Sequence, residues 1–190
     1  MHSPDAVAFV IDALNSLGSA YILTGSVASS AYGEPRSTLD ADFVLEVKGD
    51  EMNRLRRMLE SEFESEPQTS FETVTGKAQH RFRHRRTKFL IEVFEARFED
   101  AHERSRFGRR TLASFAGKKT FFPTAEDVVV QKLRWFKQLR RTKDRDDVVK
   151  VILVQWNTLD WRYIQNWCQE HETLEILEKV RQKASKTRKG

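Results

Sequence analysis

The chain has 190 residues, of which 39% are hydrophobic and 32% charged, a composition typical of a globular protein with one full core or a compact domain plus a helical appendage. No apolar run approaches the length of a membrane span and no apolar signal core stands near the N-terminus, so we expect a cytoplasmic protein with no membrane partner. Cys168 is the only cysteine, which excludes internal disulfides and a cysteine zinc site, while the net charge of +5 mildly indicates a polyanionic partner.

The first part of the chain predicts alternating helices and strands. Ser3-Pro4-Asp5 is typical of a helix start and Gly18 of a helix stop, with apolar residues at helical spacing between them. The elements expected next are a strand at Tyr21–Leu23, a helix at Gly25–Tyr32, a strand at Asp40–Val47 and a helix at Glu51–Phe63.

The rest of the chain predicts strands and then helices. The expected strands are Phe71–Val74, His80–Arg85, Phe89–Phe94 and a hairpin of Thr111–Phe115 with Lys119–Phe122. The expected helices are Ala125–Arg140, Asp144–Gln155, Leu159–Cys168 and Leu174–Lys183, with a basic tail from Lys179 that frays. The sequence therefore predicts an α+β fold, with an α/β core at 1–123 and a C-terminal helical region at 124–190 that completes its cleft.

Two carboxylates one residue apart are the first candidate site. Asp40 and Asp42 head a predicted strand, so both side chains point to one face of a sheet, where they repel unless something positive lies between them. A divalent metal is the commonest remedy. Gly25 allows close backbone approach to a phosphate, and Ser26 adds a hydroxyl donor at the positive end of a helix.

Glu92 is the best third carboxylate for a metal site. It is flanked on both sides by apolar residues, where a charge is costly unless it is paired, while Glu95 lies on the other face and is expected to be solvated. An arginine of the neighbouring Arg81–Arg86 strand is an alternative partner for Glu92. The Asp-x-Asp pair alone is weak evidence, and the hypothesis depends on the three features occurring together.

These motifs resemble the DNA polymerase β-type nucleotidyltransferase superfamily. The motifs that carry the resemblance are Gly25-Ser26, then Arg36-x-Thr38-x-Asp40-x-Asp42, then Glu92. The phrase from Gly25 to Arg36 resembles small prokaryotic members related to the AbiEii-type enzymes, several of which are toxins of toxin–antitoxin pairs. The resemblance implies a mixed β-sheet flanked by helices, magnesium dependence and binding of an NTP such as ATP.

The resemblance also implies roles for individual residues. Gly25 and Ser26 would contact the triphosphate, and Arg36 and Thr38 would lie near the phosphates or brace the loop. The implied ligands of two Mg²⁺ ions are Asp40, Asp42 and Glu92. The family often has Asp at the third position, and Glu92 is one methylene longer.

Lys132 stands near the middle of an apolar helix face, which is costly unless its amine reaches an anion or a wet cleft. One interpretation is a buried ion pair between Lys132 and Asp147, with Asp144 as a helix cap. The other is that Lys132 reaches nucleotide phosphate and Asp147 orients it. Lys132 followed by Lys143-Asp144-x-x-Asp147 resembles an AbiEii-type pattern that places Lys132 and Asp147 at the active site, so we favour the site role. The apolar faces of these helices are expected to include Leu139 and Val154.

Basic and aromatic residues form two further patterns. Arg81, Arg83 and Arg85 would share one face of a strand, which could follow the phosphates of an RNA or protect a solvated edge strand. His80 and His84 lack a third nearby ligand for a metal. The four tryptophans are typical of helix packing more than of base stacking.

The sequence thus predicts a metal-dependent nucleotidyltransferase that transfers NMP from an NTP to an acceptor hydroxyl, with pyrophosphate as leaving group. RNA, with tRNA as one candidate, is the favoured acceptor because of the basic charge, and the resemblance adds a toxin role with an antitoxin partner. Two rivals stay open: a small-molecule nucleotidyltransferase of the antibiotic-modifying kind, and a non-catalytic nucleotide- or RNA-binding module.

Overall fold

A computed structural model describes residues 3–66, 68–72 and 76–189 of the chain. The chain forms two compact units, the first made of Met1–Gly25 and Thr38–Phe122 and the second of Ser26–Ser37 and Pro123–Gly190. The predicted strand at Phe71–Val74 falls partly outside the described residues. No helix in the described part of the chain combines the length and the apolarity needed to cross a membrane.

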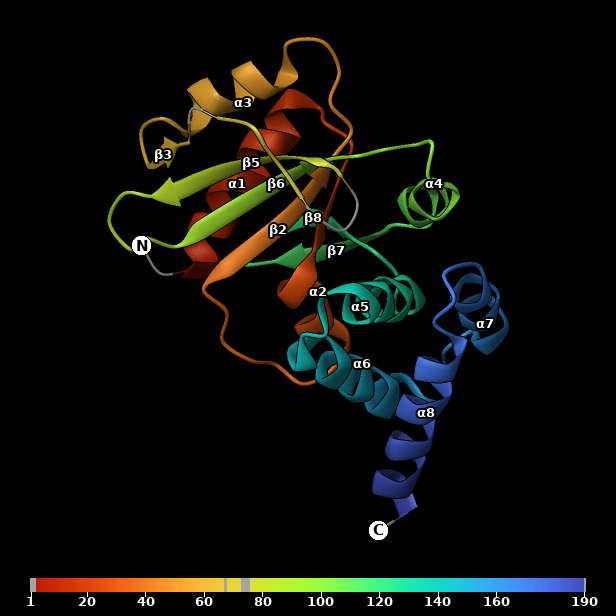
Figure 1. Ribbon diagram of the computed structural model, residues 1–190. Coiled ribbons are helices and arrows are strands. Elements are labelled where there is room, and N and C mark those ends of the chain that lie inside the picture. The colour runs from red at the N-terminus through yellow and green to blue at the C-terminus, as the bar shows by residue number, and fades with distance from the viewer. Residues whose placement is uncertain (1–2, 67, 73–75, 190) are drawn as a thin grey trace. The chain divides into compact units, whose positions relative to one another are not determined.

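The first unit is built around a mixed sheet of six strands (Figure 1). Its elements are α1 (Ser3–Leu17), β1 (Tyr21–Thr24), β2 (Asp40–Leu45), α3 (Glu51–Leu59), β3 (Phe63–Ser65), β4 (Ser70–Phe71), β5 (Ala78–His84), β6 (Leu90–Glu95), α4 (Ala101–Gly108), β7 (Thr111–Phe115) and β8 (Lys118–Phe122). The strand order is β1-β2-β6-β5-β3, with β4 also paired to β5, and β7 and β8 form a separate hairpin. Strands β2 and β6 are parallel and the other pairs are antiparallel. The predicted α+β class with a mixed sheet is confirmed.

The two faces of this sheet differ in chemistry. One face carries the fully buried Tyr21 and Phe43, whose rings pack 6.0 Å apart, and α1 lies behind the sheet in the view of Figure 1. The other face has an apolar end, where Ile22, Val44 and Phe94 pack with Phe107 of α4. Because side chains alternate along a strand, the residue two positions from each of these strand residues points to the same second face. Those residues are polar, so the other end of the second face is polar.

Several predictions for the first unit are corrected by the structure. The helix predicted to reach Phe63 ends at Leu59, and Phe63 instead begins the short strand β3. Helix α4 (Ala101–Gly108) was not predicted, because its buried residues include His102, Glu103 and Arg106, so it lacks an apolar stripe. Of the two interpretations of Arg81, Arg83 and Arg85, the solvated edge strand is wrong, because β5 lies between β6 on one side and β3 and β4 on the other.

The second unit consists of helices. They are α2 (Gly25–Tyr32), which belongs to this unit from Ser26 onward, α5 (Ala125–Leu139), α6 (Thr142–Gln155), α7 (Trp161–Glu170) and α8 (Leu174–Lys189). Helix α6 packs against α5 and α8, and α7 packs against α5. The chain after α2 runs so close to α6 that a Cβ atom on Gly33 would lie 3.1 Å from the amide nitrogen of Val151.

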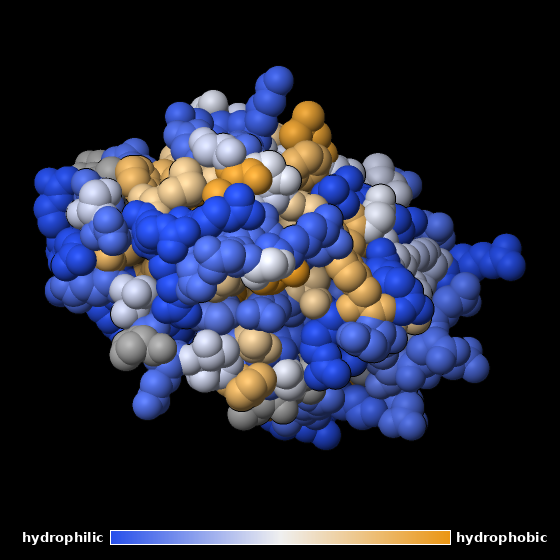
Figure 2. Space-filling view, turned by 90° about the horizontal axis from the view of Figure 1, so that it is seen from above, coloured by the Kyte–Doolittle hydropathy of each residue, from blue (hydrophilic) through white to orange (hydrophobic). Residues whose placement is uncertain are grey.

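Two expectations about these helices are wrong. The segment from Lys179, predicted to fray, is helical to Lys189, beyond the predicted helix end at Lys183. Leu139 and Val154, assigned to apolar inward faces, are 38% and 57% exposed, because each lies near the end of its helix. Figure 2, which views the molecule from above, shows a largely hydrophilic surface in which apolar side chains form patches interrupted by hydrophilic ones.

Candidate functional site

Three predicted site carboxylates lie together on the polar end of the sheet in the first unit. In the parallel pair of β2 and β6, Asp42 is the direct register partner of Glu92, so the two side chains project from the same face. Asp40 lies two residues before Asp42 on the same strand and therefore on that face as well. The prediction that Asp40 and Asp42 share one face is thus correct at the level of strand register, whereas their convergence with Glu92 on a metal stays a prediction.

The end of β1 brings Gly25 against this group. Thr24 is the antiparallel register partner of Asp42, and Gly25 follows with a positive φ of 62°. A Cβ atom built on Gly25 would lie 1.7 Å from Oδ2 of Asp42. Glycine is therefore required at this position for two reasons, the left-handed backbone and the close approach of a carboxylate.

The side chains around the carboxylates hold two of them by hydrogen bonds. The hydroxyl of Thr38 donates to Oδ1 of Asp40 at 2.7 Å. Oε1 of Glu92 accepts hydrogen bonds from Nε2 of Gln79 at 2.7 Å and from Nε of Arg81 at 3.0 Å. Gln79 and Arg81 are on β5, so the alternative partner foreseen for Glu92, an arginine of the neighbouring strand, is present.

The donor set of this face suits magnesium, because carboxylate oxygens are the ligands that a hard divalent cation prefers. With the side chains as placed, no group of three or more His, Cys, Asp or Glu residues among those that the structure describes is arranged to hold a metal ion. The contacts of Glu92 explain this, since its carboxylate is turned toward β5. By chemistry and by their shared strand face, Asp40 and Asp42 are the residues that would hold an ion, and Glu92 would have to turn away from Arg81 to join them.

The other predicted site residues lie in the second unit and form a network of their own. Arg36 binds the carboxylate of Asp147 in a bidentate manner, Nε to Oδ1 and Nη2 to Oδ2, both at 3.1 Å. The same Nη2 donates to the hydroxyl of Ser26 at 2.7 Å. Ser26, which follows Gly25 in the chain, is therefore held through Arg36 by Asp147.

Lys132 is a second cation that contacts Asp147 in this network. Its Nζ is 2.9 Å from Oδ2 of Asp147 and 2.9 Å from Oδ1 of Asp144, and its side chain is only 4% exposed. Asp144 also accepts from Nε of Arg141 at 2.8 Å. The expected ion pair between Lys132 and Asp147 is thus present, whereas Asp144 does not cap α6, which starts at Thr142 and has Arg141 at its N-cap position.

The electrostatics of Asp147 follow from these contacts. Burial raises the pKa of its carboxyl, but the hydrogen bonds from Arg36 and the charge of Lys132 outweigh it, so the pKa lies below its usual value. Asp147 is therefore ionised near neutral pH and can hold both cations at once. Asp146 is half-buried and contacts Arg145 at 3.3 Å and Lys183 of α8 at 3.8 Å.

Sequence reasoning missed the roles of Gln79 and Asp144. Gln79 begins the basic segment and carried no signal of its own, and Asp144 was interpreted as a helix cap and as part of the Lys143-Asp144-x-x-Asp147 pattern, not as a partner of Lys132. A signal for Gln79 exists in the alternation along β5, because Gln79 and Arg81 share the face that Glu92 occupies on the adjacent strand. Which strand lies beside which is a matter of tertiary pairing, and the sequence alone does not specify it.

Comparison with solved structures identifies the fold. The chain is similar to an antigenic nucleotidyltransferase-like protein from Paracoccidioides brasiliensis, with a TM-score of 0.60 and 18% identity over 94% of this chain and 91% of that one. It is also similar to ANT(2'')-Ia in complex with adenylyl-2''-tobramycin, with a TM-score of 0.63 and 12% identity over 90% of this chain and 97% of that one. The fold is that of the nucleotidyltransferases. No family model matches the sequence, and no curated protein matches it either.

Proposed function

We propose that this nucleotidyltransferase-fold protein transfers NMP from an NTP to a hydroxyl group of an acceptor, in a Mg²⁺-dependent reaction with RNA as the acceptor class. The observation that carries the proposal is the register of β2 and β6, which aligns Asp42 with Glu92 and puts Asp40 on the same face beside Gly25. Three hard oxygen donors next to a glycine that admits close approach suit a metal–triphosphate complex. Likeness of fold alone does not fix an activity, so the proposal depends on these residues.

The residues of the first unit would act as follows. Asp40 and Asp42 would bind the cations, and Thr38 holds Asp40 in place through its hydroxyl. Glu92 would give up its hydrogen bond from Arg81 and join the two aspartates on the side where the acceptor binds. Bound Mg²⁺ would supply charge neutralisation on the phosphates and acidify the attacking hydroxyl.

The residues of the second unit would position Ser26, the residue expected to contact the triphosphate. Arg36 orients the Ser26 hydroxyl, and Asp147 orients Arg36. Lys132 is engaged by two carboxylates, so its role at the site would be to keep Asp147 in place and charged. The direct contact of Lys132 with phosphate stays a prediction.

Transfer of labelled nucleotide tests the proposal. The protein is incubated with each α-labelled NTP, Mg²⁺ and total RNA, with Asp42→Ala as the inactive control. Label in RNA that requires Mg²⁺ and is lost in Asp42→Ala is the expected result. Label in neither RNA, protein nor a small molecule would overturn the proposal and favour a binding module without catalysis.

An antibiotic-type activity is the second candidate, favoured by the likeness to ANT(2'')-Ia with its adenylyl-2''-tobramycin. The same assay decides between the two when an aminoglycoside replaces RNA, since the label would then appear in the small molecule. A toxin role with an antitoxin partner stays a prediction from the sequence resemblance. Growth arrest on expression, relieved by Asp42→Ala, would support it.

A further inference from the structure

A cluster of aromatic and cationic side chains lies on the C-terminal helices and takes no part in the proposed site. Trp156 is the C-cap of α6 and Trp161 begins α7, and their rings pack edge to face with centroids 5.4 Å apart. The guanidinium of Arg181, on α8, lies over the Trp161 ring at 4.3 Å and the Trp156 ring at 5.7 Å. Arg188, two turns further along, lies over Trp156 at 4.9 Å.

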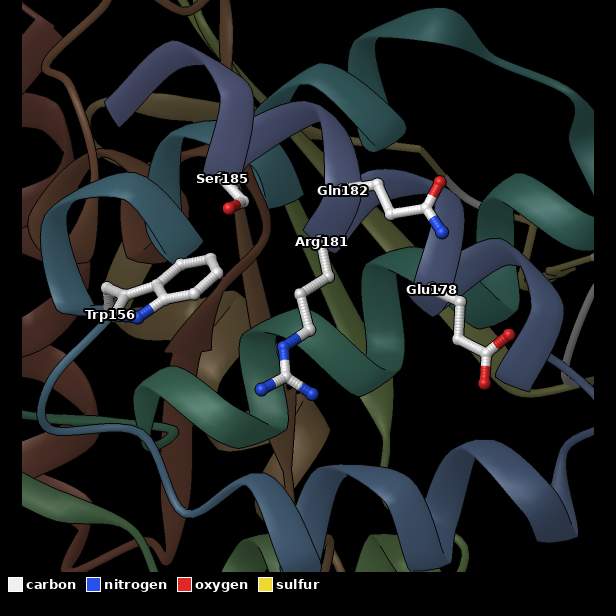
Figure 3. Close-up of a pocket in the computed structure, with 5 residues that line it drawn as sticks. All are labelled: Trp156, Glu178, Arg181, Gln182 and Ser185. Carbon is white, nitrogen blue, oxygen red and sulfur yellow. The ribbon is translucent and has the colours of Figure 1, made fainter. Parts of the chain in front are cut away.

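A cavity opens beside this cluster (Figure 3). Its volume is about 380 Å³, at the lower end of the range of small-ligand sites. The residues that line it are Trp156, Glu178, Arg181, Gln182 and Ser185. The indole of Trp156 and the guanidinium of Arg181 supply flat surfaces, while the other three side chains supply hydrogen-bond donors and acceptors.

The charge of α8 selects the kind of ligand. From residue 179 to residue 188 the helix has five basic residues and no acidic residue: Lys179, Arg181, Lys183, Lys186 and Arg188. Its buried stripe is formed by Leu177, Val180 and Ala184, and by helical spacing Arg181 and Arg188 lie together along one side of that stripe. At about 100° per residue, Arg181 and Arg188 share the side of α8 next to the cavity, whereas Lys179, Lys183 and Lys186 lie on the opposite side, where Lys183 pairs with Asp146. The cations beside the cavity are therefore the two arginines, which match the phosphates of a polynucleotide.

We propose that this surface, the Trp156–Arg181 platform, binds an unpaired base of a single-stranded polynucleotide, with the base stacked on Trp156 and Arg181 and the flanking phosphates on the basic part of α8. Proteins bind single strands by this combination of a flat aromatic or guanidinium plane and a cationic track. Glu178 and Gln182 would face the polar edge of the base, since amide and carboxylate groups match its amino and carbonyl groups. The inference names the acceptor class of the proposed transfer reaction and in that respect rests on it, but binding itself requires no NTP.

The alternative is that Arg181 only clamps α8 onto α6 and α7 through cation–π contacts. A clamp predicts that its removal lowers stability and leaves binding of nucleic acid unchanged in the folded fraction. A platform predicts a loss of binding under conditions where the variant is fully folded. The two are therefore separable by measuring unfolding and binding on the same protein.

The experiment is fluorescence anisotropy with labelled 12-mer oligonucleotides, without NTP or Mg²⁺. The probes are single-stranded RNA, single-stranded DNA, a duplex and an abasic strand with the same number of phosphates. The variants are Arg181→Ala, Arg181→Lys and Trp156→Leu, and Arg162→Ala is the matched control, since it removes one exposed positive charge from α7. Arg181→Ala and Trp156→Leu are expected to weaken binding of the single strand about tenfold, as for the loss of one stacked base, and Arg162→Ala less than about twofold.

The remaining arms decide the mechanism. The abasic strand and the duplex are expected to bind more weakly than the single strand, and Arg181→Lys is expected to restore only part of the affinity because lysine lacks the planar group. RNA and DNA arms identify which polynucleotide is preferred. Equal binding of the abasic strand, or unchanged binding in folded Trp156→Leu and Arg181→Ala, would overturn the proposal. Asp42→Ala is expected to bind as the unmodified protein does, so a failed transfer reaction and a failed platform give different results.

Discussion

Gly25 approaches Asp42 so closely that a Cβ atom on the glycine would lie 1.7 Å from the carboxylate oxygen Oδ2. The approach joins the end of β1 to the strand that carries Asp40 and Asp42, and it depends on the absence of a side chain. A left-handed φ of 62° adds a second demand for glycine at the same residue.

Gly25→Ala is therefore expected to destabilise the protein by about 2–5 kcal/mol, as the sum of left-handed strain and overpacking against Asp42. Gly49→Ala is the matched control, because Gly49 has a φ of 56° but no atom within 4 Å of the place that an added methyl group would occupy. We expect Gly49→Ala to lower the free energy of unfolding by about 1 kcal/mol, the cost of the left-handed backbone alone. Urea unfolding monitored by circular dichroism measures both.

A double variant isolates the contact. Asp42→Ala in the Gly25→Ala background removes the colliding carboxylate and leaves the backbone strain, so about half or more of the lost stability should return. Gly49→Ala should show no such coupling to Asp42→Ala. Strictly additive effects of Gly25→Ala and Asp42→Ala would contradict the close approach.

A second prediction concerns competition for Glu92. Arg81 pairs with the Glu92 carboxylate at 3.0 Å, and the two side chains are 39% and 16% exposed. If Glu92 must leave Arg81 to join the aspartates, then Arg81→Gln should lower the Mg²⁺ concentration needed for NTP binding about two- to fivefold, the worth of one partly exposed ion pair. Titration of Mg²⁺ with a fluorescent NTP analogue measures the shift.

Arg83→Gln is the control for this change, since it removes an exposed arginine from the same strand. It should leave the Mg²⁺ dependence unchanged. If Glu92→Gln raises the Mg²⁺ concentration needed for NTP binding but Arg81→Gln leaves that concentration unchanged, then Arg81 does not compete for the carboxylate.

Features that depend on residues close together in the chain could be predicted from the sequence, and features that depend on residues far apart could not. Helix α2 and the hairpin of β7 and β8 were predicted close to their observed bounds, because small-residue helices and Gly117-centred turns have local signals. The shared face of Asp40 and Asp42 follows from the alternation of a single strand. These features need no knowledge of distant residues.

Features made by distant contacts were not predicted. The position of β5 inside the sheet, and with it the hydrogen bond from Gln79 to Glu92, depends on which strands pair. An arginine of this strand was foreseen only as an alternative partner for Glu92. Helix α4 is held by the Asp100 cap and by a buried cluster in which Glu103 binds Lys77 and Arg106, so its pattern lacks apolar periodicity.

Burial and the charge of Arg106 lower the pKa of Lys77 to about 8.

A third prediction tests the buried ion pair of Lys132. Loss of one partner from a buried pair costs about 3–5 kcal/mol, and we expect Lys132→Met to lie near the lower end because Arg36 and Arg141 still neutralise the two aspartates. Lys137→Met is the matched control on the same helix, since its partner Glu172 is 83% exposed, and it should cost less than about 1 kcal/mol. Equal losses of stability in the two variants, measured by urea unfolding, would argue against a structural role for Lys132.

The pH dependence of stability gives a fourth prediction, centred on Asp147. Its pKa in the folded protein lies below the usual value, because the hydrogen bonds from Arg36 and the charge of Lys132 outweigh the opposing effect of burial. The folded state thus binds fewer protons than the unfolded state in this range, so the stabilisation is present above the unfolded pKa of about 3.9 and is lost as pH falls through the folded pKa.

Asp147→Asn removes this titration and serves as the reference. The difference in free energy of unfolding between the unmodified protein and Asp147→Asn should be largest near pH 7 and should shrink below about pH 4. Other acids such as Glu103 titrate equally in both proteins and cancel in the difference. A difference that stays constant from pH 7 to pH 3 would contradict the low pKa of Asp147.

A fifth prediction uses Cys168 as a probe of the C-terminal helices. Cys168 is fully buried on α7, and burial raises the pKa of its thiol to about 11, with a hydrogen bond involving Thr173 opposing the shift. At pH 8 about one thiol in a thousand would be ionised even where reagent could reach it. We expect negligible reaction with a disulfide reagent such as DTNB in native buffer and complete reaction of one thiol in guanidinium chloride.

The labelling rate should then report opening of α7 and α8. Leu177, 2% exposed on α8, can be truncated to alanine, and the cavity should destabilise the packing by about 2 kcal/mol or more and raise the native labelling rate about 30-fold. Leu112→Ala on β7 removes a side chain that is 60% exposed and should leave the rate unchanged. Rapid labelling of the unmodified protein under native conditions would contradict the buried position of Cys168, because reaction requires both exposure of sulfur and loss of its proton.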